Sequence, residues 1–243
     1  MDVVILAAGM GTRLGNLTST KPKALVEVAG RALIEYAIEA ALFIEAEKII
    51  IVGGSGYKQL EQFVVEKKKD NPKQIMIVEN KDFKKGNLYS LRRACPFIDK
   101  EFFLTNVDHV FSRSLMMEVA RLSGEIRRLT LFADSTKPIL NDQMKILACG
   151  ARVNKISKTL ASYNHGYNGS DYCPQNAIKQ FKQAIFGVYS EQAAKEDVFN
   201  QLIKSDQAVS VLEINGHNWF EVDTPADLLV AEKLVSQAPD EWA

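Results

Sequence analysis

A glycine-rich turn near the start of the chain carries side chains suited to binding phosphate. The apolar run 3–7 leads into Gly9 and Gly11, Arg13 follows, and Lys23 comes soon after. Glycines let backbone N–H groups approach phosphate oxygens closely, and arginine and lysine neutralise phosphate charge. A loop of this kind is suited to wrap a triphosphate, whereas a plain tight turn after a buried strand would not require the two basic residues.

Two familiar phosphate-binding loops do not match this turn. A Walker A loop ends in Gly-Lys-Ser/Thr, whereas Gly15 is followed here by Asn16. A dinucleotide-binding fingerprint needs a third glycine, which here comes one residue late. Pro22 also disfavours a helix that opens directly at the turn. An NAD-binding dehydrogenase is therefore a distant alternative.

Two acidic residues far apart in the sequence are candidates for binding a metal ion. Asp108 follows the apolar run 101–105, and Asp223 directly precedes Thr224-Pro225, which is a good helix start. An acid at the carboxyl end of a buried strand lies where open α/β sheets bind ligands. Mg²⁺ takes hard oxygen ligands, usually one or two carboxylates together with substrate phosphates and water. Taken alone, each acid also fits a structural role, as a turn residue or as a helix N-terminal acid.

The elements that must position these residues alternate between strand and helix in the first half of the chain. Continuous apolar runs predict strands, and apolar positions at helical spacing predict helices. The predicted strands are 3–7, 48–52, 74–78 and 101–105, and the predicted helices are 31–45, 57–68 and 88–94. This alternation predicts an α/β fold with a mostly parallel central sheet and helices on both faces.

After about residue 125 the predicted strands become mixed. We expect strands at 128–133, 143–148, 152–156, 184–189 and 208–214, and helices at 190–203 and 226–235. Residues 161–177 are rich in Tyr, Asn, Gly and Ser, and they are interpreted as a long loop. We expect one domain over residues 1–243, with a nucleotide-binding half at about 1–125 and an acceptor-binding half at about 126–243.

Composition bounds the class of protein. The 243 residues carry a formal net charge of +0, so bulk electrostatics gives no reason to expect nucleic acid or an anionic membrane as a partner. The three distant cysteines Cys95, Cys149 and Cys173 indicate a reducing compartment. No apolar run is long enough to span a bilayer. We therefore expect a cytoplasmic protein, and the sequence leaves its oligomeric state open, a homo-oligomer included.

The run from Leu6 to Leu14, followed by Lys21 to Leu25, resembles the signature of nucleotidyltransferases that join a nucleoside triphosphate to a phosphorylated sugar or alcohol. The resemblance implies a nucleotide-diphospho-sugar transferase-like, Rossmann-like fold and dependence on Mg²⁺. It implies catalytic roles for Arg13 and Lys23, and for Asp108 and Asp223 as the two metal-binding aspartates. It also implies that the nucleotide is bound by Leu6, Ala7, Ala8, Gly9, Gly11, Thr12, Arg13, Lys23, Asn80, Gly86, Asn87 and Ser90.

The run Gly86-Asn87-Leu88-Tyr89-Ser90-Leu91 is more particular. It resembles the CTP:inositol-1-phosphate cytidylyltransferase family, with phosphocholine cytidylyltransferases of the same fold next; a plain Asn-capped helix is the alternative. The resemblance extends in order over nearly the whole chain and implies an acceptor site formed by Asp134, Lys145 and Glu221. It departs at Ile185, where the family pattern has a polar residue, and at 161–177, which look like an insertion.

Together these features predict an Mg²⁺-dependent transferase that joins CMP from CTP to a phosphorylated alcohol such as inositol 1-phosphate and releases pyrophosphate. The alternatives are a sugar-1-phosphate transferase that uses UTP, dTTP or GTP, a phosphocholine cytidylyltransferase, and, from another class, a non-catalytic nucleotide-binding protein. The acceptor phosphate is already ionised at neutral pH, so positioning and charge neutralisation suffice. His109 is therefore not required as a general base.

Overall fold

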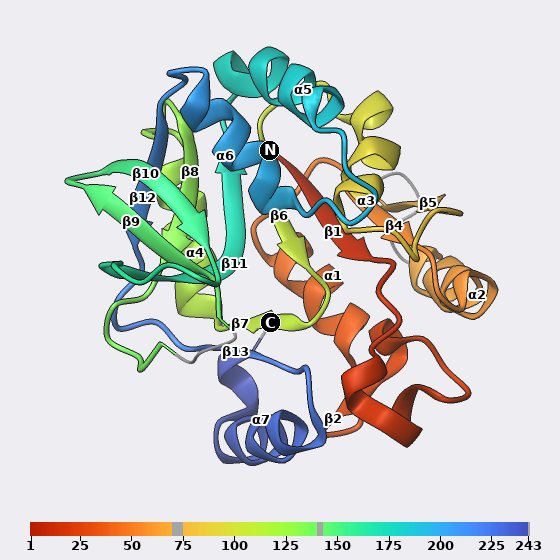
Figure 1. The fold of residues 1–243 in the computed structure, drawn as a ribbon. Helices are drawn as coiled ribbons and strands as arrows, with labels where there is room; N and C mark the ends of the chain where they lie inside the picture. Colours follow the sequence, from red (N-terminus) through yellow and green to blue (C-terminus); the bar gives the residue numbers. More distant parts are fainter. Residues whose placement is uncertain (70–74, 140–142, 243) are drawn as a thin grey trace.

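The computed structural model describes residues 1–69, 75–139 and 143–242, and its centre is one nine-stranded sheet. The strand order is β5-β4-β1-β6-β11-β8-β12-β10-β9, so strands from both halves of the chain share the sheet. Figure 1 shows β1, β4 and β5 at one side, β8, β9, β10 and β12 at the other, and β6 and β11 between them. Within the described residues, no helix is both long and apolar enough to cross a membrane.

The first half of the sheet is parallel, as the alternation of strands and helices predicts. Its strands are β1 (Asp2–Ala7), β4 (Ile49–Gly53), β5 (Ile75–Glu79) and β6 (Phe102–Asn106). The connecting helices are α1 (Leu33–Phe43), α2 (Tyr57–Lys68) and α3 (Leu88–Ala94), and the short strands β2 (Glu27–Val28) and β3 (Arg31–Ala32) form a separate pair.

The second half mixes parallel and antiparallel pairing. Its strands are β8 (Leu129–Ala133), β9 (Lys145–Cys149), β10 (Arg152–Ser157), β11 (His165–Cys173) and β12 (Val209–Glu213). Strand β12 runs parallel to β8, whereas β11 is antiparallel to both β6 and β8. Its helices are α4 (Arg113–Ser123), α5 (Ile178–Gly187), α6 (Lys195–Lys204) and α7 (Pro225–Gln237).

Both faces of the sheet are buried against helices. Along β1, Val3 and Ile5 pack into one hydrophobic cluster, and Val4 and Leu6 pack into another, because successive strand side chains point to opposite faces. The first cluster includes buried residues of α1, α2, α4 and α7, and the second includes those of α3, α5 and α6. The predicted α/β fold with helices on both faces is confirmed.

One predicted loop is a central strand. Residues 161–177, interpreted as a loop and as an insertion, contain β11, which lies between β6 and β8. Its sequence is polar and contains two glycines, so neither apolar alternation nor β-propensity indicates a strand. Several of its polar side chains are paired inside the protein, where the Tyr167 hydroxyl donates to Asp171 Oδ1 at 2.6 Å and Ser170 Oγ donates to Asn168 Oδ1 at 2.8 Å.

One predicted strand is a helix. Residues 184–189 were expected to be a strand, but α5 extends to Gly187. The buried residues Ile178, Phe181, Ala184 and Ile185 follow helical spacing, which becomes visible only when the pattern is followed back to residue 178. The departure from the family pattern at Ile185 therefore lies on a buried helix face.

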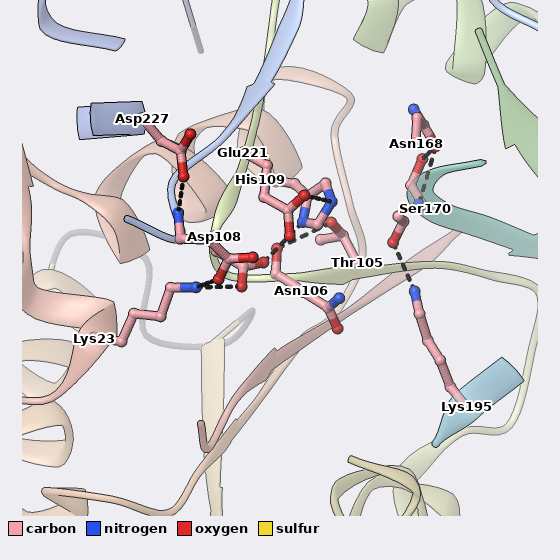
Figure 2. Close-up of polar contacts among 12 residues, drawn as sticks. Lys23, Thr105, Asn106, Asp108, His109, Asn168, Ser170, Lys195, Glu221 and Asp227 are labelled. Atoms are coloured by element: carbon pink, nitrogen blue, oxygen red, sulfur yellow. Dashed lines mark hydrogen bonds and ion pairs between the residues drawn. The ribbon is translucent and has the colours of Figure 1, made fainter. Parts of the chain in front are cut away.

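A buried ion pair joins α6 to β11. Lys195 and Asp171 are 0% and 1% exposed, and Lys195 Nζ donates to Asp171 Oδ2 at 3.0 Å and to the Gly169 carbonyl at 2.6 Å. Figure 2 shows the Lys195 side chain reaching toward the strand that carries Asn168 and Ser170. The pair holds the first turn of α6 against the middle of β11.

Removing one partner of this pair should destabilise the protein strongly. We expect Lys195→Met to lower the free energy of unfolding by about 3–5 kcal/mol, because the buried Asp171 charge would lose its counter-ion. Urea denaturation of the full chain measures this change. Lys204→Met, at the exposed end of the same helix, is the control and should change stability by less than about 0.5 kcal/mol. An unchanged unfolding midpoint for Lys195→Met would contradict the assignment.

Candidate active site

A short antiparallel ribbon brings the two predicted metal-binding acids together. Strand β7 (His109–Phe111) pairs with β13 (Trp219–Glu221), so the residues just before β7 meet those just after β13. The backbone N–H of Val222 donates to the Asp108 carbonyl at 2.9 Å and closes this junction. The ribbon therefore places Asp108 and Asp223 side by side at the carboxyl end of β6.

Lys23 lies between the two acids. Its Nζ is 2.6 Å from Asp108 Oδ2 and 2.5 Å from Asp223 Oδ1, and Figure 2 shows its side chain extended toward Asp108. Arg13 Nη2 adds a contact of 2.5 Å to Asp223 Oδ2. All four predicted catalytic residues are thus in one ion-paired group, although they come from three distant parts of the chain.

The loop after β1 holds Lys23 in place. Lys23 begins a short 3-10 helix (Lys23–Leu25), and its side chain is only 7% exposed. Gly11 has a left-handed φ of 65°, and a Cβ on it would lie 2.9 Å from the Cβ of Lys23. Glycine at this position therefore allows the left-handed backbone conformation and leaves room for the Lys23 side chain to pack against the turn.

The start of α7 holds Asp223. The Thr224 Oγ accepts from the Asp227 N–H at 3.2 Å, and Asp227 Oδ2 accepts from the N–H groups of Thr224 at 2.7 Å and Asp223 at 3.1 Å. This reciprocal cap satisfies backbone N–H groups that a helix start leaves open. The predicted Thr-Pro-Ala-Asp helix start is confirmed, and it fixes the backbone from which Asp223 projects.

Electrostatics keeps Lys23 charged and both aspartates ionised. Burial alone would lower the pKa of Lys23, but the Asp108 and Asp223 carboxylates raise it above its usual value. Burial works to raise the pKa of Asp108, yet the Lys23 ammonium and the His109 hydrogen bond hold it well below its usual range. Burial opposes ionisation of Asp223 as well, but hydrogen bonding with Glu221 and the Lys23 charge lower its pKa.

His109 and Glu221 face each other across the ribbon, beside Asp108. His109 Nδ1 is 2.8 Å from Asp108 Oδ1, and its Nε2 is 3.9 Å from Glu221 Oε2. Burial raises the pKa of Glu221 to about 7, and the nearby Asp108 and Asp223 carboxylates act in the same direction. Each of the residues Asp108, His109 and Glu221 offers one possible metal-ligand atom, and these three atoms lie within 4.8 Å of one another. This group offers a metal ion an alternative set of ligands that shares Asp108.

Gly169 on β11 leaves the space that His109 fills. Its φ is +86°, and a Cβ there would lie 2.1 Å from His109 Nε2. We expect Gly169→Ala to lower the free energy of unfolding by about 1–3 kcal/mol through backbone strain, with further loss from displacing His109. Urea denaturation tests this, with Gly124→Ala as the control because nothing lies within 4 Å of its added Cβ. Equal stability of the two variants would contradict the role of Gly169.

A cavity of about 180 Å³ opens beside the glycine-rich turn. Six predicted nucleotide-binding residues line it, namely Leu6, Ala8, Gly9, Lys23, Asn87 and Ser90. The lining also includes Phe83, Lys85, Asn106, Val107 and Asp108. Phe83 and Lys85 were not predicted, although both lie between Asn80 and Gly86, two residues expected at the nucleotide.

The other six predicted nucleotide-binding residues do not line this cavity, namely Ala7, Gly11, Thr12, Arg13, Asn80 and Gly86. Asn80 is buried, and its amide nitrogen donates to Ser90 Oγ at 3.0 Å while its carbonyl accepts from the Asp82 N–H at 2.9 Å. A Cβ on Gly86 would lie 1.9 Å from the Ala193 carbonyl oxygen, so this glycine permits close packing against the segment before α6. Ala7 is the last residue of β1 and is 1% exposed.

A larger cavity of about 600 Å³ adjoins the first. The two share Asn87, Asn106 and Asp108, so they meet beside the ion-paired acids. The larger cavity is lined by three basic side chains and five acidic ones, namely Arg13, Lys137 and Lys158, and Asp108, Glu196, Glu221, Asp223 and Asp227. Lys137 and Lys158 were not predicted, although Lys158 lies in one of the stretches that carry the family resemblance.

Two predicted acceptor-binding residues lie behind the wall of this cavity. Lys145 is 6% exposed and donates to the Lys158 carbonyl at 2.8 Å. Asp134 is 2% exposed, and its Oδ2 accepts from the Trp219 indole N–H at 3.0 Å. Both residues therefore contact groups that line the cavity, whereas the third predicted acceptor residue, Glu221, lines it directly.

The fold and the site together define a nucleotidyltransferase-type α/β domain, with a glycine-rich turn, a basic residue and two acids at one sheet edge. Residues 3–136 match the MobA-like NTP transferase domain, and the chain belongs to this family. The predicted resemblance to nucleotidyltransferases is confirmed.

Known proteins that resemble all or part of the chain carry related names. It is 28% identical over 240 residues to the bifunctional IPC transferase and DIPP synthase of Rubrobacter xylanophilus, covering 97% of this chain and 52% of that protein. It is 33% identical over 116 residues, 47% of this chain and 46% of the other, to the UTP–glucose-1-phosphate uridylyltransferase AglF of Haloferax volcanii. The chain thus spans about half the length of the curated relatives it matches.

The inositol-1-phosphate CTP transferase from T. maritima has the same fold. The two structures superpose with a TM-score of 0.81 at 23% identity, covering 96% of each chain. This likeness extends over both halves of the sheet and shows that the mixed second half belongs to the same architecture.

Proposed function

We propose that the protein transfers CMP from CTP to the phosphate of a phosphorylated alcohol, with inositol 1-phosphate as the first candidate, and releases pyrophosphate. The observation that carries the proposal is the Lys23 ammonium, held between Asp108 and Asp223 where the two cavities meet. The smaller cavity beside the glycine-rich turn would hold the nucleotide, and the larger one would hold the acceptor. The name of the T. maritima protein of the same fold, inositol-1-phosphate CTP transferase, supports this choice of nucleotide and acceptor.

The reaction needs charge neutralisation more than proton transfer. An acceptor phosphate oxygen forms a bond to the α-phosphorus, the bond from that phosphorus to the pyrophosphate oxygen breaks, and pyrophosphate leaves with the electron pair. Lys23 would stabilise the negative charge that develops at the α-phosphate. Arg13, Lys137 and Lys158 would attract the acceptor phosphate to the larger cavity. His109 would position Asp108 through its hydrogen bond.

The acidic residues suit a magnesium ion. Asp108 and Asp223 direct carboxylate oxygens to one point, and Mg²⁺ prefers such hard oxygen ligands. We infer that these two residues hold the ion, which when bound would offset charge on the nucleotide phosphates. The Lys23 ammonium already binds both carboxylates, so the arrangement favours a cation between them.

A pyrophosphate-release assay tests this function. The four nucleoside triphosphates are crossed with inositol 1-phosphate, phosphocholine and glucose 1-phosphate in the presence of Mg²⁺, and products are identified by mass. We expect the greatest turnover with CTP and inositol 1-phosphate. Greatest turnover with UTP, dTTP or GTP and glucose 1-phosphate would instead establish a sugar-1-phosphate transferase, which the AglF similarity favours. Nucleotide binding without release by any pair would establish a non-catalytic protein.

A further inference from the structure

Glu196 presents a buried carboxylate to the larger cavity. The residue lies in the first turn of α6, is 8% exposed and lines the cavity. Among the described parts of the chain, no side chain forms a hydrogen bond or ion pair with its carboxylate, whose one hydrogen bond is with its own backbone N–H. A carboxylate in this position has capacity left to accept hydrogen bonds from a bound molecule.

The backbone that carries this carboxylate is fixed from several sides. The Lys195 N–H donates to Asn87 Oδ1 at 2.7 Å, and the Lys195 side chain is anchored on β11 by Asp171. Asp197 Oδ2 accepts from the Ala194 N–H at 2.8 Å and caps the same turn. Because Asn87 also lines the nucleotide cavity, Glu196 is held at a set position relative to both cavities.

The chemistry of a carboxylate indicates what Glu196 binds. A carboxylate with capacity left accepts hydrogen bonds from O–H or N–H donors of a ligand. A phosphorylated polyol such as inositol 1-phosphate presents several hydroxyl donors, whereas the quaternary ammonium of phosphocholine presents none.

We propose that Glu196 binds hydroxyl groups of the acceptor. The basic residues Arg13, Lys137 and Lys158 would receive the phosphate, and Glu196 would receive the hydroxyls of the same molecule. This inference rests on the proposed nucleotidyl transfer. It adds the residue that binds the hydroxyl groups of the acceptor.

Glu196→Gln tests the inference, because the change keeps the shape of the side chain and removes its charge. We expect the kcat/KM for inositol 1-phosphate to fall roughly 10- to 100-fold, as when a hydrogen bond to a charged group is lost, while the KM for CTP stays unchanged. Glu191→Gln, an exposed glutamate in the preceding turn, is the matched control and should behave as the wild type. Equal melting temperatures of the proteins show that folding is intact.

Deoxy analogues of inositol 1-phosphate, each lacking one hydroxyl, separate recognition from a general defect. The wild-type protein should lose most of its kcat/KM on at least one analogue, and Glu196→Gln should lose little more on that same analogue. A variant whose losses match those of the wild type on every analogue would overturn the role of Glu196. Preference of the wild type for phosphocholine would overturn it and leave nucleotidyl transfer standing, whereas no turnover with any acceptor would overturn both.

Discussion

Lys23→Met is expected to lower kcat by roughly 10²–10³, the scale observed when one preorganised charge-stabilising donor is lost. Lys23 is the ammonium that binds Asp108 and Asp223 together, and it lines the smaller cavity. Methionine fills similar space but supplies no charge, so the two carboxylates would also repel each other. Steady-state turnover at saturating CTP, acceptor and Mg²⁺ measures the effect.

Lys21→Met provides the control for this experiment. Lys21 lies two residues earlier in the chain, and its 37% exposed side chain contacts Glu27 at 3.5 Å, away from the acids. We expect this variant to keep wild-type kcat, because an exposed ion pair contributes little. Wild-type turnover in Lys23→Met would remove Lys23 from the mechanism and would require another residue to stabilise the α-phosphate.

Asp108→Asn is expected to abolish Mg²⁺-dependent activity while the protein stays folded. The amide is nearly the same size, but it removes a negative charge that Lys23 and His109 both contact. An uncharged ligand would hold Mg²⁺ weakly, because this ion prefers carboxylate oxygens. Product formation measured over a series of Mg²⁺ concentrations, with circular dichroism to check folding, tests the prediction.

Asp206→Asn is the matched control for the metal assignment. Asp206 is 87% exposed, and it pairs with Arg152 at the surface, at 2.5 Å. The same chemical change there should leave both turnover and Mg²⁺ dependence unchanged. If Asp108→Asn kept activity with the wild-type dependence on Mg²⁺, Asp108 would not be a metal ligand, and the group that includes Glu221 would need to be reconsidered.

The glycine-rich turn, Lys23 and the two acids were predictable because each belongs to a short local pattern. Gly9 and Gly11 with Arg13 describe a loop, and Thr224 with Asp227 describes a helix cap that the structure confirms. The hydrogen-bond partners of individual polar side chains were less predictable. Asn80 was expected at the nucleotide, yet its amide group is used by Ser90 and Asp82, which lie up to ten residues further along the chain.

The second half was predicted less well because its polar residues act inside the protein. Tyr167 and Asp171 of β11 are polar, so their residue types suggest a surface loop. In the structure, however, they are buried, at 6% and 1% exposure. They are tolerated in the sheet because Lys195, from a helix more than twenty residues away, supplies the missing charge. A pattern read along a single segment cannot include such a partner.

The amino-acid sequence by itself determined the α/β class, the glycine-rich turn, the nucleotidyltransferase resemblance and the acids, since these depend on residue types at short spacing. Only the tertiary structure decided that β11 is a central strand, that Lys23 lies between Asp108 and Asp223, and that Glu196 opens onto the larger cavity. These facts depend on pairing between distant segments, above all the β7–β13 ribbon and the Lys195–Asp171 ion pair. Such pairing is set by the packing of the whole chain, because the groups that satisfy one another are brought together only when it folds.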